Sequence, residues 1–393
     1  MDDERLHSPT DGVRLDFADL RSGVRLRVAS AGQRRGARAT LLFLHGWPEV
    51  WFSWRKQLSF FAGKGFYCLA PDLRGFGASE CPHSAAAYSC HHVASDMIAL
   101  LQHHGVRKCA LIGHDWGAIL GWQFALLHPE YFPVVANLSV PLSLRTQSMP
   151  DLVTLLERVF GKQGAPEQQF YYILYHNELF PGTEDHGPAE AEYDANPHEL
   201  LRTMWTDTSV PQDPLPTPAA SQLRKDGGFL AHHGKRPRHL PAWLSEDDLS
   251  YVVEQYKLSG FRGGVNLYRN FKANHETTAM LVGRKVKQPV FFLTGEDDMV
   301  RGMSKFFSSS SSSTAKNAEN AASSSDPQKL GLLRVCTDLR AFHVLRRSSH
   351  KTAGHWIQQE QADEVNALLL NFLEDTQEVM DRAPGGGCVG AKL

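Results

Sequence analysis

The pentapeptide 113–117, with the sequence GHDWG, lies between two apolar segments of different pattern. Residues 108–112 suit a short buried strand, and residues 118–125 favour a helix. A sharp strand-to-helix turn strains the backbone of its central residue, which is why small residues flank it. The turn would raise the side chain of Asp115 above the strand ends, where a carboxylate can attack carbon. An aspartate that merely caps the following helix is the alternative interpretation.

Short apolar runs bounded by turn signals recur along the chain, and helical stretches separate them. They predict further strands at residues 24–28, 40–44, 66–70, 135–140, 289–294 and 341–345. Strands that alternate with helices predict an α/β fold with a doubly wound, mostly parallel sheet. Functional side chains are then expected at the carboxyl ends of the strands.

The strand signal disappears in the middle of the chain, where helical segments rich in Tyr, Leu and Phe take over. We therefore expect a helical cap at 142–280, inserted between a first core part at 1–141 and a second at 281–393. Within the cap, residues 211–241 are heavy in Pro, Gly and His and favour an irregular excursion. A Ser, Ala and Asn tract at 308–325 is expected to be a disordered insert.

Composition excludes several classes of partner and cofactor. The net charge is −2 and the basic residues are scattered, so we expect no nucleic-acid binding and a small neutral substrate. The acidic N-terminus lacks an apolar signal region, and no run is long enough to span a membrane, which predicts a soluble intracellular protein. Six cysteines without C-x-x-C spacing indicate neither disulfides nor zinc. We expect no cofactor, and the oligomeric state stays open.

The C-terminal tripeptide Ala391-Lys392-Leu393 resembles a peroxisomal address, and the preceding glycines would leave it accessible. A peroxisomal import receptor is therefore a candidate partner, and the predicted location is the cytoplasm, the peroxisome or both. A frayed tail without any address is the alternative.

An aspartate nucleophile needs a base to activate water, and that base needs an orienting acid. His355, in a Gly-His-Trp sequence after the last predicted strand, is the candidate base, with His350 as its rival. Asp298 follows the strand at 289–294 and is the candidate orienting acid, although Asp297 or a solvated acidic turn is an alternative. The chain order Asp115, Asp298, His355 is typical of the α/β-hydrolases.

An oxyanion hole is predicted from the sequence HGWPE at 45–49, which directly follows the strand at 40–44. The backbone N–H groups of Trp47 and Trp116 would form it. The bond between Trp47 and Pro48 is a candidate for a cis peptide, because it stands in a tight turn after a strand.

With these features in place, the chain resembles the epoxide hydrolases of the α/β-hydrolase fold, most closely the hydrolase domain of the soluble vertebrate-type enzymes. The resemblance covers most of the chain. The tract at 308–325 is foreign to the family pattern. We also expect no counterpart of the phosphatase-like domain that precedes the hydrolase in those enzymes. It rests on HGWPE, DLRGFGAS (72–79), GHDWGA (113–118), FYYILY (170–175), GFRGGVNLYRN (260–270), GEDD (295–298) and GHW (354–356).

The resemblance implies that two cap tyrosines hydrogen-bond the epoxide oxygen, and by motif these are Tyr172 and Tyr268. Tyr171 and Tyr175 lie close to the first of them, and a core aromatic residue is the alternative role for both. Two phenols suit the chemistry, because opening a neutral epoxide develops an alkoxide that one phenol stabilises and another protonates.

The predicted function is therefore hydrolysis of a lipophilic epoxide to a vicinal diol, through a covalent ester on Asp115. A haloalkane dehalogenase shares the aspartate nucleophile, but a halide leaving group needs no proton from a tyrosine pair. A third possibility is a hydrolase fold without catalysis that binds a small ligand or a protein partner.

Overall fold

The computed structural model describes residues 7–142, 150–163, 165, 167–206, 222–233, 239–301, 326–348 and 352–382. The predicted insert at 308–325, the rival base His350 and the C-terminal tripeptide lie outside these residues.

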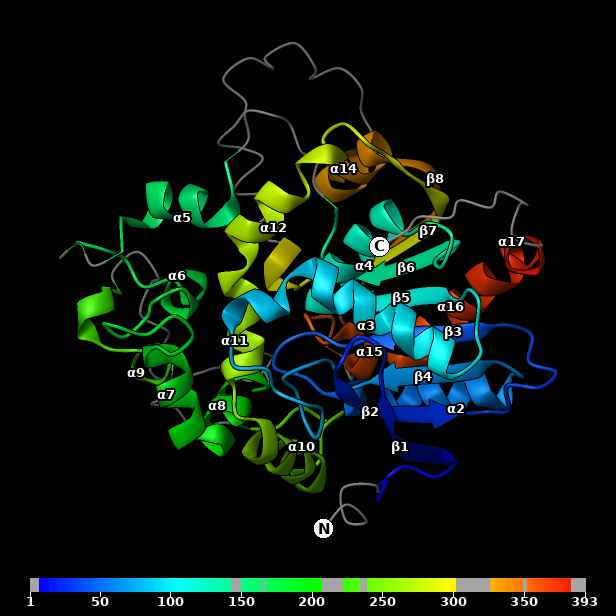
Figure 1. Ribbon diagram of the computed structural model, residues 1–393, viewed down its shortest axis with the longest axis horizontal. Helices are drawn as coiled ribbons and strands as arrows, with labels where there is room; N and C mark the ends of the chain where they lie inside the picture. The colour runs from blue at the N-terminus through cyan, green and yellow to red at the C-terminus, as the bar shows by residue number, and fades with distance from the viewer. Residues whose placement is uncertain are drawn as a thin grey trace.

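One eight-stranded sheet forms the centre of the molecule (Figure 1). Its order is β1-β2-β4-β3-β5-β6-β7-β8; the pairs β1/β2 and β2/β4 are antiparallel and all others are parallel. The strands are β1 (Val13–Asp19), β2 (Arg25–Ala31), β3 (Thr40–Leu44), β4 (Tyr67–Pro71), β5 (Ala110–His114), β6 (Val134–Leu138), β7 (Val286–Gly295) and β8 (Cys336–Leu345). The prediction of a mostly parallel sheet is confirmed.

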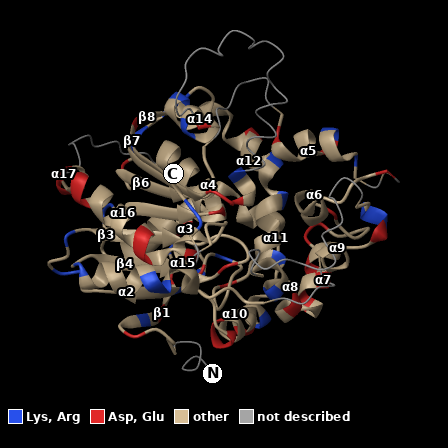
Figure 2. Cartoon of the chain, turned by 180° about the vertical axis from the view of Figure 1, so that it is seen from behind, with Lys and Arg blue, Asp and Glu red and all other residues tan. Residues whose placement is uncertain are grey.

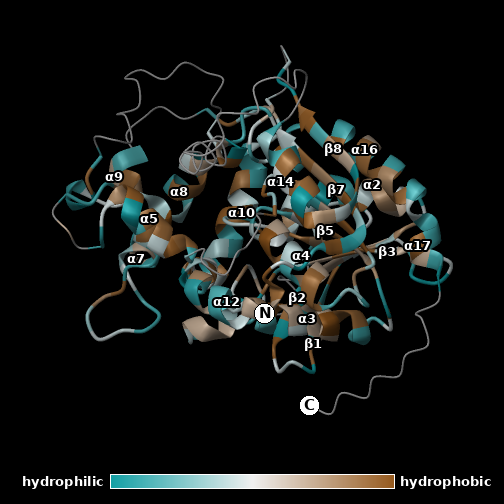
Figure 3. Cartoon of the chain, turned by 90° about the horizontal axis from the view of Figure 1, so that it is seen from above, coloured by the Kyte–Doolittle hydropathy of each residue, from teal (hydrophilic) through white to brown (hydrophobic). Residues whose placement is uncertain are grey.

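Helices flank the sheet and connect its parallel strands. They are α2 (Arg55–Gly63), α3 (Cys90–His103), α4 (Trp116–Leu127), α14 (Pro327–Val335), α15 (Ile357–Glu360), α16 (Ala362–Asp375) and α17 (Gln377–Asp381). Short 3-10 turns, η1 (Trp51–Trp54) and η2 (Ala85–Tyr88), lie in the connections. The hydrophobic colouring concentrates on the strands and on the helix faces beside them (Figure 3).

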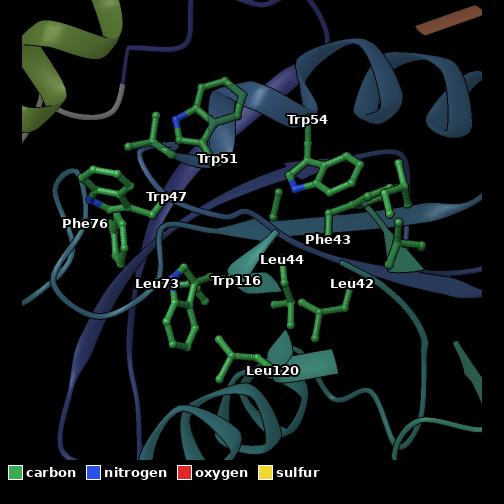
Figure 4. Close-up of a cluster of buried hydrophobic side chains, with 14 of the residues drawn as sticks. Leu42, Phe43, Leu44, Trp47, Trp51, Trp54, Leu73, Phe76, Trp116 and Leu120 are labelled. Carbon is green, nitrogen blue, oxygen red and sulfur yellow. The ribbon is translucent and has the colours of Figure 1, made fainter. Parts of the chain in front are cut away.

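Burial explains why the central strands could be recognised from the sequence. Every residue of β3, β4, β5 and β6 is buried, as expected for parallel strands covered on both faces. Side chains from β3, the loop after it and the start of α4 pack into one cluster, which includes Trp47, Trp54 and Trp116 (Figure 4). Strand β1 was not predicted, because it lies at the sheet edge and alternates between buried and exposed residues.

Among the described residues between β6 and β7, all regular elements are helical apart from one isolated bridge between Gln169 and Leu223. They are α5 (Leu152–Phe160), α6 (Tyr172–His176), α7 (Pro188–Ala195), α8 (Pro197–Met204), η4 (Arg224–Asp226), α9 (Phe229–His233), α10 (Glu246–Ser259), α11 (Arg262–Arg269), α12 (Phe271–Thr277) and η5 (Ala279–Leu281). The prediction of an irregular segment at 211–241 was wrong in one respect, because the helix α9 forms within it. In Figure 1 most of these helices lie to one side of the sheet, with α11 and α12 next to it.

Basic and acidic residues are interspersed both along the helices that flank the sheet and along those between β6 and β7 (Figure 2). Within the part of the chain that the structure describes, no helix combines the length and the apolar character needed to cross a bilayer.

Candidate active site

The turn between β5 and α4 holds Asp115 in a backbone conformation that is rare for a residue with a side chain. Its φ is 53° and its ψ is −117°. The two flanking glycines are required by packing: a Cβ at Gly113 would overlap the backbone of Gly117, and one at Gly117 would overlap the carbonyl of Leu44. The turn is therefore as sharp as predicted, and its strain is concentrated at the candidate nucleophile.

The side chain of Asp115 does not cap the helix that it precedes. Asp115 occupies the N-cap position of α4, but its carboxylate makes no capping hydrogen bond. Instead, the backbone N–H of Trp47 donates to Oδ1 of Asp115 at 2.8 Å. Trp116 begins α4, so its N–H belongs to the first turn and has no helical acceptor. The peptide bond between Trp47 and Pro48 is cis, as expected.

His355 faces the other oxygen of the same carboxylate. Its Nε2 lies 3.5 Å from Oδ2 of Asp115, and the side chains are only 7% and 13% exposed. The loop that carries His355 is anchored by Glu360, whose carboxylate accepts hydrogen bonds from the N–H groups of Gly354 and Trp356 at 2.7 and 2.8 Å. A loose contact of this length is common before substrate tightens a site.

Asp298, and not Asp297, is the acid that faces His355. Oδ1 of Asp298 lies 2.9 Å from Nδ1 of His355, whereas the side chain of Asp297 is exposed. The N–H of Val300 also donates to Asp298 at 2.9 Å, and the hydroxyl of Thr294 donates at 3.2 Å. The three residues that the sequence picked from distant segments are thus brought together.

Electrostatics favours the ionised form of Asp115. Burial opposes the charge, but the hydrogen bond and charge of His355, the charge of His114 and the Trp47 N–H together hold the pKa of Asp115 below its usual value. Burial alone would lower the pKa of His355, yet the carboxylates of Asp298 and Asp115 outweigh it and raise that pKa well above its usual value. The two carboxylates therefore favour the protonated form of His355 in the free site.

The candidate tyrosines stand above this site from two different helices. The rings of Tyr172 on α6 and Tyr268 on α11 contact each other edge to face, with centroids 5.9 Å apart. Tyr268 also contacts the rings of Trp116 and Trp47 at 4.9 and 5.8 Å. The pKa of each phenol is raised well above its usual value, mainly by burial, so both remain protonated donors.

The two rival tyrosines point elsewhere. The ring of Tyr171 stacks on that of Phe160, with centroids 4.4 Å apart. The hydroxyl of Tyr175 donates to the carbonyl of Pro188 at 2.9 Å and to Glu192 at 3.1 Å. Tyr172 is therefore the tyrosine of the segment 170–175 whose ring contacts the ring of Tyr268.

Comparison with known proteins assigns this arrangement to a family. Residues 39–300 match the family model of the alpha/beta hydrolase fold. Over 354 residues the chain is 36% identical to epoxide hydrolase A of Mycobacterium tuberculosis H37Rv, which covers 90% of this chain and 95% of that protein. The chain belongs to the epoxide hydrolases of the α/β-hydrolase fold. It is an enzyme that hydrolyses epoxides.

Further relatives agree with this assignment. The structure of epoxide hydrolase A from Mycobacterium thermoresistibile superposes with a TM-score of 0.70 at 32% identity, covering 92% of this chain and 98% of that one. The bifunctional epoxide hydrolase 2 of Rattus norvegicus is 29% identical over 367 residues, and this chain spans 56% of its length. Among the residues that the structure describes, no group of three or more His, Cys, Asp or Glu side chains is placed to hold a metal ion.

A second buried layer, which the sequence did not predict, supports the loop of His355 in this epoxide hydrolase. Nδ1 of His114 lies 2.8 Å from Oε2 of Glu49, and its Nε2 lies 2.8 Å from the carbonyl oxygen of His355. The hydroxyl of Ser139, just after β6, donates to the same carbonyl at 3.0 Å. Both His114 and Glu49 stand inside the motifs GHDWG and HGWPE, but no local pattern shows that they pair.

Close contacts at two glycines set the distance between α11 and the core. A Cβ at Gly263 would overlap the backbone of Gly75, and one at Gly264 would overlap the indole of Trp47. Tyr268 follows Gly264 by about one helical turn on the same face. The two glycines therefore let α11 approach closely enough to place the Tyr268 phenol near Trp116.

We expect Gly264→Ala to lower both stability and activity of the epoxide hydrolase. The added methyl must displace the Trp47 indole or lift α11, an overpacking cost of about 1–3 kcal/mol. Thermal unfolding and the rate of epoxide opening measure the two effects. Gly331→Ala is the control, because this helical glycine has no neighbour within 4 Å of an added Cβ. An unchanged melting temperature in Gly264→Ala would contradict the close contact.

Proposed function

We propose that this epoxide hydrolase works through a covalent ester on Asp115. Trp47 binds Oδ1 of the carboxylate, which leaves Oδ2 to attack a ring carbon of the epoxide. The carbon–oxygen bond of the ring breaks as the ester bond forms, and negative charge develops on the ring oxygen. The lowered pKa of Asp115 supports this role, because only the carboxylate is nucleophilic.

Tyr172 and Tyr268 bind the epoxide oxygen, and one of them transfers its proton to the departing alkoxide. Their raised pKa values keep both phenols protonated until that charge appears. The helical segment between β6 and β7 then acts as a cap that supplies these donors, while the core supplies the nucleophile. This division assigns residues 1–141 and 281–393 to the core and 142–280 to the cap.

His355 activates the water that hydrolyses the ester. In the free enzyme two carboxylates raise its pKa, but esterification removes the charge of Asp115 and with it part of that effect. The pKa of His355 therefore falls on alkylation, and the ring becomes a base when water needs one. Water adds to Cγ of Asp115, and the N–H groups of Trp47 and Trp116 stabilise the oxyanion on Oδ1.

The substrate class follows from the surroundings of the reacting groups. The nucleophile and the phenols are enclosed by aromatic rings, including Trp116 and Phe271, whose centroids lie 4.9 Å apart. An uncharged, lipophilic epoxide suits such walls. The observation that carries the proposal is the pair of phenols opposite an ionised aspartate. A haloalkane dehalogenase does not need these phenols, because a halide leaving group takes no proton.

A panel of aryl, terminal and fatty-acid epoxides, assayed beside haloalkanes for diol and halide release, tests this function. We expect diol from epoxides and no halide. Single turnover in heavy-oxygen water should place the label in Asp115 and leave the diol unlabelled. Label that appears in the diol and never in Asp115 would exclude the ester.

Replacing either tyrosine by Phe should slow alkylation by about 100-fold, and replacing both should remove most of it. Each phenol supplies a hydrogen bond that strengthens in the transition state, worth roughly 2–4 kcal/mol. Stopped-flow single turnover measures the effect. Tyr171→Phe and Tyr175→Phe are the controls. Slow alkylation by Tyr175→Phe together with an unchanged rate in Tyr172→Phe would show that the wrong tyrosine is assigned.

We also propose that part of the enzyme enters peroxisomes through Ala391-Lys392-Leu393. An N-terminal fluorescent fusion, which leaves the tail open, should give a punctate peroxisomal signal. Deletion of Leu393 or a C-terminal fusion should return the signal to the cytosol. A diffuse signal from the open-tailed fusion would show that the tripeptide is not an address.

A further inference from the structure

His176 is a buried polar side chain for which the proposed mechanism has no role. It ends α6, one helical turn after Tyr172, and is fully buried. Its ring meets Tyr268 at 4.4 Å between centroids, Trp47 at 4.8 Å and Tyr172 at 5.5 Å, in each case edge to face. The imidazole thus touches both candidate phenols and the residue whose N–H binds the nucleophile.

One hydrogen bond ties this ring to a neighbouring helix. Nε2 of His176 lies 3.0 Å from the hydroxyl of Tyr193 on α7, which is also fully buried. Within the part of the chain that the structure describes, Nδ1 has no hydrogen-bond partner. Burial, aided by the charge of Arg269, lowers the pKa of His176 well below its usual value, so the ring is neutral.

An apolar ring would fill this position without the cost of burying an imidazole with one nitrogen unpaired. What His176 adds is orientation, because the bond to Tyr193 prevents the ring from turning about its side-chain axis. Since its ring meets those of Tyr172 and Tyr268 edge to face, a fixed ring limits where both phenols can lie. The phenols in turn hold the epoxide oxygen and so decide which ring carbon faces Asp115.

We propose that His176, tethered by Tyr193, is a positioning residue that holds the phenols of Tyr172 and Tyr268 over Asp115 and thereby sets which epoxide carbon is attacked. This inference rests on the proposed function of the two tyrosines. It concerns the alkylation step alone, because ester hydrolysis depends on His355 and the core.

The test uses the full chain with trans-β-methylstyrene oxide, whose two ring carbons are inequivalent. His176→Phe and Tyr193→Phe should each slow alkylation by about tenfold, as small misplacements of reacting groups do. The double variant should be no slower than either single one, because both remove the same hydrogen bond. His176→Gln, which can still reach Tyr193, should recover most of the rate.

Two further readouts separate positioning from a general structural role. Ester hydrolysis, followed as decay of the alkyl-enzyme, should change by less than about twofold, because its groups lie in the core. Multiple turnover in heavy-oxygen water should show a changed ratio of attacked carbons in the Phe variants. Tyr67→Phe is the matched control, since it removes another Tyr–His hydrogen bond, of 2.9 Å to His104.

Unchanged alkylation and an unchanged carbon ratio in His176→Phe would overturn the inference, as would an equal loss in both half-reactions. If His176→Phe does not fold, Tyr193→Phe decides by the same criteria, because it removes a single oxygen atom. Tyr172→Phe and Tyr268→Phe are measured alongside. Normal alkylation in those two would overturn the proposed function and this inference together, whereas slow alkylation in them beside a normal His176→Phe would overturn this inference alone.

Discussion

His355→Gln should react once with an epoxide and then stop. Alkylation needs the carboxylate and the phenols, but hydrolysis of the ester needs a base, so the second step should slow by about 100-fold or more. Mass spectrometry of the protein after mixing should find the mass of the substrate added to the peptide that contains Asp115.

His128→Gln serves as the control, because His128 lies at the surface end of α4 beside Glu130. It should turn over normally and accumulate no adduct. Normal turnover by His355→Gln would exclude His355 as the base, and an adduct on any other peptide would exclude Asp115 as the nucleophile.

Asp115→Asn should abolish multiple turnover, with kcat lower by about 10⁴-fold or more, because an amide is a poor nucleophile and the covalent route closes. No adduct should form. The fold should survive, since the carboxamide keeps the size of the side chain and an oxygen for the Trp47 N–H. Diol production measures the loss, and thermal unfolding reports the fold.

The neighbouring acids provide a paired control for this variant. Asp297→Asn should retain activity because its side chain is exposed, whereas Asp298→Asn should slow ester hydrolysis because it removes the carboxylate that faces Nδ1 of His355. Turnover by Asp115→Asn at the rate of the unmodified enzyme would show that the ester is not on the pathway.

Local sequence pattern was sufficient for the main elements of the core. Strands β3 to β7 are recognisable because burial on both faces demands continuous apolar runs, and the turn at Asp115 is recognisable because close backbone contacts demand glycines. Strand β1 escaped because an edge strand is buried on one side only and its alternating pattern is weaker.

The placement of the candidate site residues was predictable where they directly follow a strand. Asp115, Asp298 and His355 all stand beyond carboxyl ends of parallel strands, and such ends meet at one edge of the sheet. The choice between Asp298 and Asp297 needed coordinates, because adjacent side chains in a turn diverge and only packing decides which one is buried.

The sequence by itself therefore determined the type of fold and indicated the candidate residues Asp115, Asp298 and His355 in their chain order, since these depend on periodicity and on the backbone freedom of glycine. Only the tertiary structure decided which tyrosine of the segment 170–175 meets Tyr268, how Glu49 pairs with His114, and that His176 contacts both phenols. These contacts join segments far apart in the chain. Their geometry depends on how α6 and α11 pack against the core, which no local pattern of residues specifies.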